Sequence, residues 1–349
     1  MSTDKRQGRR LDIRHGRIDL SHGAGGRAMG QLIDELFQPA LDNAWLRQGN
    51  DQAAFDLPGG RTVMSTDAYV ISPLFFPGGD IGSLAVHGTI NDLAMAGARP
   101  LYLSASFILE EGFPLADLQR IAASMGGAAR AAGVPVITGD TKVVERGKAD
   151  GVFISTAGVG VVPPGLDLSG DKARPGDIVI ISGTVGDHGV AVMSKRQNVE
   201  FETAIVSDSA PLHTLVADMV AAAGPSLRLM RDPTRGGLAA TLNEIAQQSA
   251  VGMRLAESAI PVRPEVAAAC ELLGLDHLNV ANEGKLIAVV AREAAGLLLA
   301  AMQAHPLGRA AAVIGEIVRD EQHFVQMETR FGGSRIVAWL SGEQLPRIC

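Results

Sequence analysis

Short apolar segments with the alternation of β-strands recur along the whole chain, and helical patterns separate them. The strand patterns cover residues 61–70, 101–109, 134–137, 151–162, 178–181, 227–230, 286–290, 311–318, 323–328 and 335–340. Apolar residues at helical spacing cover residues 32–37, 83–96, 115–129, 212–223, 238–246, 265–273 and 292–304. Because 349 residues are many for one hydrophobic core, this alternation predicts two α/β or α+β domains of similar size.

Composition narrows the class of protein. Hydrophobic residues make up 46% of the sequence and charged residues 20%, which is enough apolar material for buried cores. The net charge of −7 argues against a surface that binds nucleic acid by neutralising phosphates. No run of 18 uncharged apolar residues occurs, and charges fill the N-terminus where a signal peptide needs an apolar segment. We therefore expect a cytoplasmic protein without a membrane partner, with a domain boundary at Pro163-Pro164-Gly165.

Four aspartates stand where ligand-binding carboxylates are expected in α/β proteins. Asp67 falls at the end of a predicted strand, Asp140 and Asp232 each follow one, and Asp92 lies on a helix between two strands. Carboxylates that converge from separate elements bind hard divalent cations, and Mg²⁺ held in this way bridges to substrate phosphates. Each aspartate alone also fits a helix cap or a turn. Together they favour a site for magnesium and a nucleotide.

Two further side chains are candidates for proton transfer. Lys142 lies two residues past Asp140, so both point to the same face of an extended strand. A lysine there could hold a phosphate or, if desolvated, act as a base. Glu283, in the turn before a predicted strand, is the other candidate base, although a solvated loop acid has the same spacing.

A glycine-rich segment precedes the first helix. Four glycines between residues 23 and 30, Gly25 and Gly26 among them, surround Arg27. Their backbone N–H groups can wrap an anion and the arginine can add a contact, although a flexible hinge has the same composition. The basic residues before this segment are interpreted as a solvated leader: Lys5, Arg6, Arg9, Arg10, Arg14 and Arg17.

The chain ends in Pro346-Arg347-Ile348-Cys349, which puts a thiol at the extreme C-terminus behind a residue that cannot continue a helix. Such an end can enter a site and leave it, although an incidental cysteine on a frayed terminus has the same sequence. The other cysteine, Cys270, lies in an apolar helical pattern and is expected to be a core residue. Two cysteines are too few for a disulfide framework or an all-cysteine metal site.

Six ordered motifs resemble the AIR-synthase (PurM-like) ATP-binding superfamily. They are Ser65-Thr66-Asp67, Asn91-Asp92-Leu93-Ala94-Met95-Ala96-Gly97-Ala98, Thr138-Gly139-Asp140-Thr141-Lys142-Val143, Gly186-Asp187-His188-Gly189, Asp232-Pro233-Thr234-Arg235-Gly236-Gly237 and Asn282-Glu283-Gly284. Within that superfamily, the Pro-Arg-Ile-Cys ending resembles the HypE family of hydrogenase maturation proteins, which make cyanide ligands for nickel–iron centres. The similarity spans residues 20–349.

This resemblance implies a two-domain PurM-like fold of the α/β (α+β) class. It divides the chain into a flexible leader with a glycine-rich phosphate loop (1–40), an N-terminal ATP-binding and dimerisation domain (41–165), a C-terminal α/β domain (166–338) and a mobile tail (339–349). It implies a homodimer that binds ATP and Mg²⁺. It also implies that HypF transfers a carbamoyl group to Cys349, that the group is dehydrated to a thiocyanate, and that the cyanide passes to iron on a HypC–HypD complex.

The positions that match the family motifs define a candidate site. The implied metal ligands are Asp67, Asp92, Asp140 and Asp232. The implied ATP-binding residues are Gly25, Gly26, Arg27, Asp67, Asn91, Asp92, Thr138, Gly139, Asp140, Asp232, Thr234, Arg235, Gly236 and Gly237. Cys349 would carry the carbamoyl and cyano groups, with Lys142 and Glu283 near the tail for proton removal and orientation. The sequence leaves open which of these two residues is the base.

Two other functions fit parts of the sequence. A selenophosphate synthetase resembles the central part of the chain, but its reactive cysteine or selenocysteine lies near the N-terminus, where this chain has none. A non-catalytic carrier would use the tail only to dock on a partner. The intact set of aspartates argues against the carrier.

Overall fold

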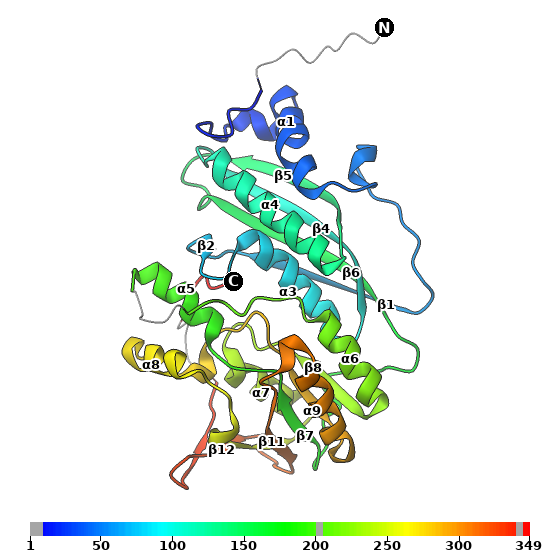
Figure 1. Ribbon diagram of the computed structural model, residues 1–349, viewed down its shortest axis with the longest axis vertical. Helices are drawn as coiled ribbons and strands as arrows, with labels where there is room; N and C mark the ends of the chain where they lie inside the picture. Colours follow the sequence, from blue (N-terminus) through cyan, green and yellow to red (C-terminus); the bar gives the residue numbers. More distant parts are fainter. Residues whose placement is uncertain (1–9, 200–204, 340–344) are drawn as a thin grey trace.

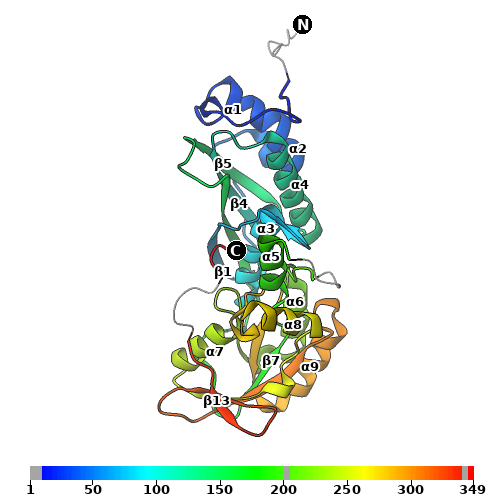
Figure 2. The same cartoon turned by 90° about the vertical axis from the view of Figure 1, so that its left-hand side faces the viewer.

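The computed structural model describes residues 10–199, 205–339 and 345–349. Two sheets lie one above the other along the long axis of the molecule, and the C-terminus lies between them (Figure 1, Figure 2). Within these ranges no helix combines the length and the apolar character that a membrane span requires. Three of the basic side chains predicted to form a leader, Lys5, Arg6 and Arg9, lie outside the described residues.

The N-terminal sheet has the strand order β1-β6-β4-β5. Its strands are β1 (Arg61–Tyr69), β4 (Arg99–Glu110), β5 (Val136–Val144) and β6 (Val152–Val162). β6 pairs antiparallel with β1 and β4, whereas β4 and β5 run parallel because a crossover helix connects them. That helix, α4 (Leu115–Ala132), and α3 (Ile81–Met95) cover one face of the sheet (Figure 1), and the hairpin of β2 (Phe75–Phe76) and β3 (Gly79–Asp80) precedes α3.

Local signals in the sequence fix both helices. The carboxylate of Asp80 caps α3 by accepting hydrogen bonds from the N–H groups of Gly82 and Ser83, at 2.8 and 3.2 Å. α4 ends at Gly133, whose φ of 69° lies in the left-handed region that a glycine adopts without steric cost. The apolar stripe of α4 is buried against the sheet, so the helix positions follow from pattern and caps together.

Alternation along the strands separates a buried face of this sheet from an open one. The β4 side chains that pack under the helices are Leu103, Ala105, Phe107 and Leu109. Ile108 points the other way and is 41% exposed, and Met64 on β1 is 72% exposed. Among the described residues, the segment around Phe55 covers part of this open face, with its ring 4.6 Å from that of Tyr102. Much of the face opposite to the helices therefore stays accessible.

Short helices run along the β5 edge before β1. They are η1 (Leu20–Gly23), α1 (Arg27–Leu32), the π-helical η2 (Ile33–Phe37), α2 (Gln38–Leu41) and η3 (Leu46–Gln48). A Cβ added at Gly23 would lie 2.8 Å from the backbone nitrogen of Val143 on β5. The glycine-rich segment is therefore anchored on β5, at the edge of the sheet that is farthest from β1.

The C-terminal sheet has the strand order β13-β12-β9-β11-β7-β10-β8. Its strands are β7 (Ile178–Ile181), β8 (Leu227–Arg231), β9 (Gly252–Ala256), β10 (Ile287–Val290), β11 (Ala312–Val318), β12 (Val325–Glu328) and β13 (Ser334–Ile336). The helices α6 (His213–Ala223) and α9 (Ala295–Ala304) pack in one core of this sheet and α7 (Gly237–Gln248) in another. Short 3₁₀ turns complete this half: η4 (Gly224–Ser226), η5 (Glu257–Ala259), η6 (His277–Asn279), η7 (Arg292–Ala294) and η8 (Pro306–Gly308).

Two helices of the second half pack into the core of the first. These are α5 (Asp187–Gln197) and α8 (Pro264–Leu273), which contribute Val190 and Val266 to the apolar cluster that contains α3 and α4. Leu345 and Ile348 of the C-terminal tail are buried in the same cluster. The two halves and the end of the chain therefore share one core.

The structure confirms the two-domain α/β organisation and corrects some of the predicted elements. The strand predicted at 134–137 runs from Val136 to Val144, because the β-branched residues after Asp140 continue it in register with β4. The pattern missed β9, a strand of only five residues. The strand predicted at 335–340 ends at Ile336, and its last predicted position lies outside the described residues.

Candidate functional site

The thiol of Cys349 lines a cavity of about 190 Å³ between the two halves of the molecule. The residues around this cavity are Thr66, Asp67, Gly88, Asp92, Asp232, Thr234, Arg235, Glu283 and Cys349. They come from β1, from α3, from the loop after β8, from the turn before β10 and from the tail. We call this space the thiol cavity. It brings together three of the four predicted aspartates, one candidate base and the terminal cysteine.

β1 and α3 supply two of the carboxylates. Ser65 donates a hydrogen bond to Asp92 across the strand–helix interface, at 2.6 Å between Oγ and Oδ2. Because side chains two residues apart on a strand share a face, Asp67 points to the same helix-covered side of the sheet as Ser65. The loop after β8 adds Asp232, so the two halves of the chain meet at these carboxylates.

The crowded carboxylates raise one another's pKa. Burial and the neighbouring Asp92 raise the pKa of Asp232 to about 7, and Asp67 adds to the repulsion. Burial also raises the pKa of Asp92. Carboxylates in this position bind a proton or a cation readily, because either one relieves the repulsion between like charges.

Glu283 is the most deeply placed acid of the thiol cavity. Only 3% of its surface is exposed, and burial together with Asp232 and Asp208 raises its pKa well above the ordinary value. Its Oε1 atom is buried without a hydrogen-bond partner in the structure. A buried acid with an unused oxygen next to a reactive group is suited to exchange a proton with that group.

The thiol itself is held in its neutral form. Burial and the nearby Glu283 raise the pKa of Cys349 above its ordinary value. A thiol is a nucleophile only as thiolate, so burial makes Cys349 a poorer nucleophile in this position. It can carry a group into the cavity more readily than it can attack one there.

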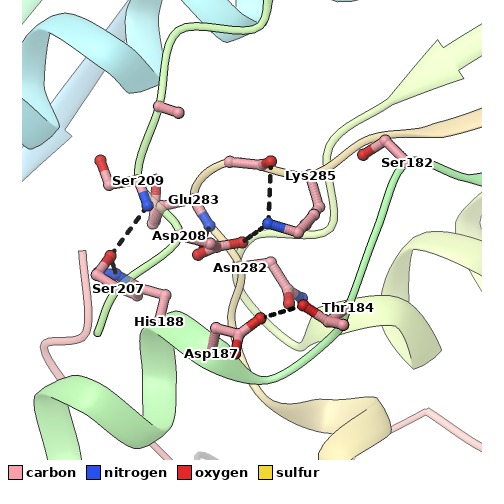
Figure 3. Close-up of polar contacts among 12 residues, drawn as sticks. Ser182, Thr184, Asp187, His188, Ser207, Asp208, Ser209, Asn282, Glu283 and Lys285 are labelled. Carbon is pink, nitrogen blue, oxygen red and sulfur yellow. Dashed lines mark hydrogen bonds and ion pairs between the residues drawn. The ribbon is translucent and has the colours of Figure 1, made fainter. Parts of the chain in front are cut away.

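A buried ion pair supports the Glu283 turn. Lys285 contacts Asp208 at 3.0 Å, and their side chains are 12% and 4% exposed (Figure 3). Asp208 also accepts a hydrogen bond from the backbone N–H of Glu283 at 3.1 Å. Burial acts to raise the pKa of Asp208, but Lys285, His188 and the backbone N–H of Glu283 together outweigh it, so the pKa is lowered. The sequence offered no pattern for this pair, because its members are 77 residues apart.

Asp140 and Lys142 do not reach the thiol cavity within one chain, and the predicted role of Lys142 near the tail stays a prediction. The register pairs Asp140 with Ser106 and Lys142 with Ile108, so both point to the open face. β5 is also three strands away from β1, or about 14 Å at ordinary strand spacing. The two side chains do share a face as predicted, and contact one another at 2.8 Å. Lys142 lowers the pKa of Asp140 through this hydrogen bond.

The remaining residues of the Thr138–Asp140 motif lie with the glycine-rich segment. Thr138, Gly139 and Asp140 line a separate cavity of about 150 Å³ together with Met29 and Ile33. Gly25 and Gly26 border open space, where an added Cβ would meet no atom within 4 Å. Arg27 begins α1 beside them. The implied ATP-binding residues therefore form two groups, one on β5 and one around the thiol cavity.

The Asn91 side chain makes three structural hydrogen bonds, and its contact with ATP stays a prediction. Its amide nitrogen donates to the carbonyls of Ala210 and Glu283, both at 3.1 Å. Its amide oxygen accepts the N–H of Leu212 at 2.8 Å. Because both amide hydrogens and one oxygen lone pair are used, the side chain ties α3 to the second half of the molecule.

The glycines after Thr234 and Arg235 shape the loop that follows β8. Gly236 and Gly237 have φ values of 75° and 60°, a conformation that side chains other than glycine rarely adopt. Gly236 and Arg235 line a second cavity of about 500 Å³, which Cys349 also borders. The thiol therefore lies between a small acidic space and a larger one.

The described parts of the chain contain no group of three or more His, Cys, Asp or Glu side chains close enough to hold a metal ion by themselves. The donor type nevertheless suits Mg²⁺, since Asp67, Asp92 and Asp232 supply carboxylate oxygens to one cavity and repel one another there. Such carboxylates match a cation that completes its coordination with phosphate oxygens and water. Asp140, the fourth implied ligand, lies elsewhere in this chain.

Comparison with known proteins is consistent across the chain. Residues 49–162 match the model of the AIR synthase related protein, N-terminal domain, and residues 174–328 match the C-terminal domain of the same proteins. The protein of Rhizobium leguminosarum bv. viciae named carbamoyl dehydratase HypE is 76% identical over 341 residues, which are 98% of this chain and 97% of that protein.

Solved structures agree with this relationship. A crystal structure of hydrogenase maturation protein HypE in complex with ATP has a TM-score of 0.91 at 50% identity, covering 95% of this chain and 99% of that one. The HypE chain of a HypE–HypF complex has a TM-score of 0.78 at 48% identity, covering 88% of this chain and 99% of that one. The chain therefore belongs to the AIR synthase related proteins and, within them, to the HypE family of carbamoyl dehydratases.

Proposed function

We propose that this protein dehydrates an S-carbamoyl group on its own Cys349 to a thiocyanate at the expense of ATP, and that the product supplies the cyanide ligand of a nickel–iron hydrogenase. The observation that carries the proposal is the place of the terminal thiol, in one cavity with Asp67, Asp92, Asp232 and Glu283. The substrate is thus part of the chain that converts it. ATP is the expected second substrate, as in the ATP complex of the HypE relative.

The chemistry requires an activated oxygen and a proton acceptor. The thiocarbamate oxygen takes the γ-phosphoryl group of ATP, and the nitrogen gives up one proton, leaving ADP and an O-phosphorylated isothiocarbamate, S–C(=NH)–O–phosphate. Loss of the second nitrogen proton then expels phosphate and leaves S–C≡N. Glu283 is the proton acceptor in this scheme, since it lines the same cavity as Cys349 and its buried Oε1 has no hydrogen-bond partner.

Mg²⁺ belongs to the proposal because ATP-dependent phosphoryl transfer needs a cation to spread the developing negative charge. Asp67, Asp92 and Asp232 would hold it together with the phosphates. Thr234 and Arg235 line the same cavity and would contact the transferred group. Burial and the neighbouring Asp92 raise the pKa of Asp232, and the same repulsion between carboxylates supports a cation at this position.

A homodimer accounts for the residues that one chain keeps apart. The open face of the N-terminal sheet carries the exposed apolar residues Met64, on β1, and Ile108, which is paired with Lys142 on β5. A second copy seated on this face would cover apolar surface. In our proposal it brings Lys142 and the glycine-rich segment of one chain to the thiol cavity of the other.

Transfer reactions need the tail outside the cavity. The proposed donor of the carbamoyl group is HypF, in line with the solved HypE–HypF complex, and the proposed acceptor of the cyanide is iron on a HypC–HypD complex. Cys349 must be a free thiol at the start of each cycle, and both cysteines are free. This requirement fits the cytoplasm, which keeps thiols reduced.

Mass spectrometry of the C-terminal peptide tests the proposal. Protein carbamoylated on Cys349 and given ATP and Mg²⁺ should lose the mass of one water at that peptide. Glu283→Gln should bind ATP but lose water about 100-fold more slowly or worse, as expected for removal of a general base. Cys349→Ala is the control, which should bind ATP and take no carbamoyl group.

Consumption of ATP without loss of water from the peptide would contradict the dehydratase. ATP-dependent release of a selenophosphate would instead identify a selenophosphate synthetase. If the protein consumed no ATP under any condition, the result would favour a non-catalytic carrier over both enzymes.

A further inference from the structure

The last four residues are bound through their backbone carbonyl groups, each of which has a partner. The carbonyl of Cys349 accepts from the N–H of Val70 at 3.0 Å, and that of Arg347 accepts from the N–H of Ser72 at 3.2 Å. The tail therefore pairs with the chain just past β1. The other partners of these carbonyls are side chains of α5.

Arg196 on α5 binds two of the carbonyls. Its Nη1 donates to Pro346 at 2.8 Å and its Nη2 donates to Arg347 at 2.7 Å. The third nitrogen, Nε, donates to the carbonyl of Ser72 at 2.8 Å. One guanidinium thus connects the tail, the segment after β1 and α5, and it uses the planar fork that distinguishes arginine from lysine.

His188, at the start of α5, binds the carbonyl next to the cysteine. Its Nε2 lies 2.9 Å from the oxygen of Ile348, and its Nδ1 lies 2.7 Å from Oγ of Ser207. A carbonyl only accepts, so Nε2 carries the hydrogen and Nδ1 accepts from the Ser207 hydroxyl. Full burial lowers the pKa of His188, which agrees with this neutral form.

The same short segment supports both the tail and the base. Ser207 orients His188 and also accepts the N–H of Ser209 at 3.1 Å (Figure 3). The next residue, Asp208, holds the Glu283 turn through the backbone N–H of Glu283. The adjacent residues Ser207 and Asp208 therefore hold His188 and the Glu283 turn, respectively. This shared support fixes the position of the Ile348 carbonyl relative to Glu283.

We propose that His188 and Arg196 are positioning residues that hold the backbone of the C-terminal tail and thereby present Cys349 to Glu283. The ligand is the C-terminal peptide of this chain, recognised through its carbonyls and through the buried side chain of Ile348. Loss of either donor shifts the tail out of the cavity and leaves the cavity residues of β1, α3 and the Glu283 turn in place. The inference rests on the proposed dehydration for its purpose, but the docking can be measured without that reaction.

Alkylation of the unmodified full-length protein with iodoacetamide measures the docking, read at each cysteine by peptide mass spectrometry. Arg196→Met removes two charge-assisted hydrogen bonds to the tail and should speed alkylation of Cys349 by about tenfold or more. Cys270 is buried on α8 with a pKa raised by burial to about 11, so it reports general loosening in the same sample. Its rate should not change.

Matched variants separate docking from loss of charge and from packing. Lys195→Met removes a charge from the exposed neighbour on α5 and should leave both cysteines at wild-type rates. His188→Gln keeps an N–H donor of similar reach and should alkylate at Cys349 more slowly than His188→Leu. A wild-type rate at Cys349 in Arg196→Met, or an equal acceleration at Cys270, would overturn the proposal.

A second readout connects docking to the reaction. In carbamoylated Arg196→Met, the single-turnover loss of water should slow by about tenfold while ATP affinity stays unchanged, because the tail alone is displaced. Alkylation that speeds up in a protein with no dehydration at all would support the docking and contradict the proposed function. Unchanged dehydration with faster alkylation would overturn the positioning role.

Discussion

Two Asp–Lys pairs of similar length occupy opposite environments in this protein. Lys142 and Asp140 are 2.8 Å apart on the open face of the N-terminal sheet, where their side chains are 63% and 53% exposed. Lys285 and Asp208 are 3.0 Å apart behind the thiol cavity, where they are 12% and 4% exposed. The first pair is two residues apart in the sequence and the second is 77 residues apart.

The comparison teaches that contact distance says little about what a pair does. Water screens the exposed pair, so it contributes little to stability and is free to meet a phosphate or a second chain. The buried pair has no water to replace a lost partner, so each member depends on the other. The exposed pair, Asp140 and Lys142, could be identified from its spacing in the sequence. The buried pair, Asp208 and Lys285, could not, because its members are 77 residues apart.

Removal of Lys285 from the buried pair should have the largest effect on stability. Lys285→Met leaves the Asp208 carboxylate buried without a counter-charge, which typically lowers the free energy of unfolding by about 3–5 kcal/mol. Chemical denaturation followed by fluorescence or circular dichroism measures this loss. Asp208→Asn combined with Lys285→Met is the control and should recover part of it, because no charge is then left alone. If Lys285→Met lowers the free energy of unfolding by less than about 1 kcal/mol, the buried pair contributes no more than an exposed ion pair does.

Substitution of Asn91 removes an uncharged buried side chain that also connects the two halves of the molecule. Asn91→Ala leaves the N–H of Leu212 and the carbonyls of Ala210 and Glu283 without their partner, which should cost about 1–3 kcal/mol of stability. Thermal unfolding measures the change, and the exposed Asn50→Ala serves as matched control. ATP affinity at a temperature where the variant is folded should match the wild type. If Asn91→Ala had wild-type stability but failed to bind ATP, Asn91 would be a nucleotide-binding residue instead.

Removal of Lys142 should have the smallest effect on stability. Lys142→Met should change the free energy of unfolding by less than about 0.5 kcal/mol, as expected for an exposed position. Because Lys142 lowers the pKa of Asp140 below its ordinary value of 3.8, any stabilisation is present above that pH and is lost as the pH falls through the lowered pKa. Denaturation curves of variant and wild type at pH 7 and near pH 3 check this sign.

The Lys142→Met variant also tests whether Lys142 acts across the proposed dimer interface. Lys142→Met alone and Cys349→Ala alone should each fail to make thiocyanate. Mixed dimers of the two should regain activity, since the thiol of one chain then meets the lysine of the other. Mixed dimers that stay inactive would show that Lys142 does not act across the interface.

The sequence by itself determined the type of most elements, the family and the candidate residues. Local rules sufficed, because apolar period, caps such as Asp80 and stops such as Gly133 act within a few residues. The ordered motifs and the terminal cysteine then identified the chemistry. The strand at 134–137 was placed too early because its β-branched continuation follows a glycine and an aspartate, which are typical of turns.

Tertiary structure alone decided which of these residues meet. Asp67 and Asp140 both lie near strand ends in the sequence, yet strand order and register put them on opposite faces of one sheet. The pairing of Asp208 with Lys285 and of His188 with the tail also joins distant parts of the chain. Such contacts depend on how whole sheets and helices pack, and a terminal thiol becomes a bound substrate only when that packing has built its cavity.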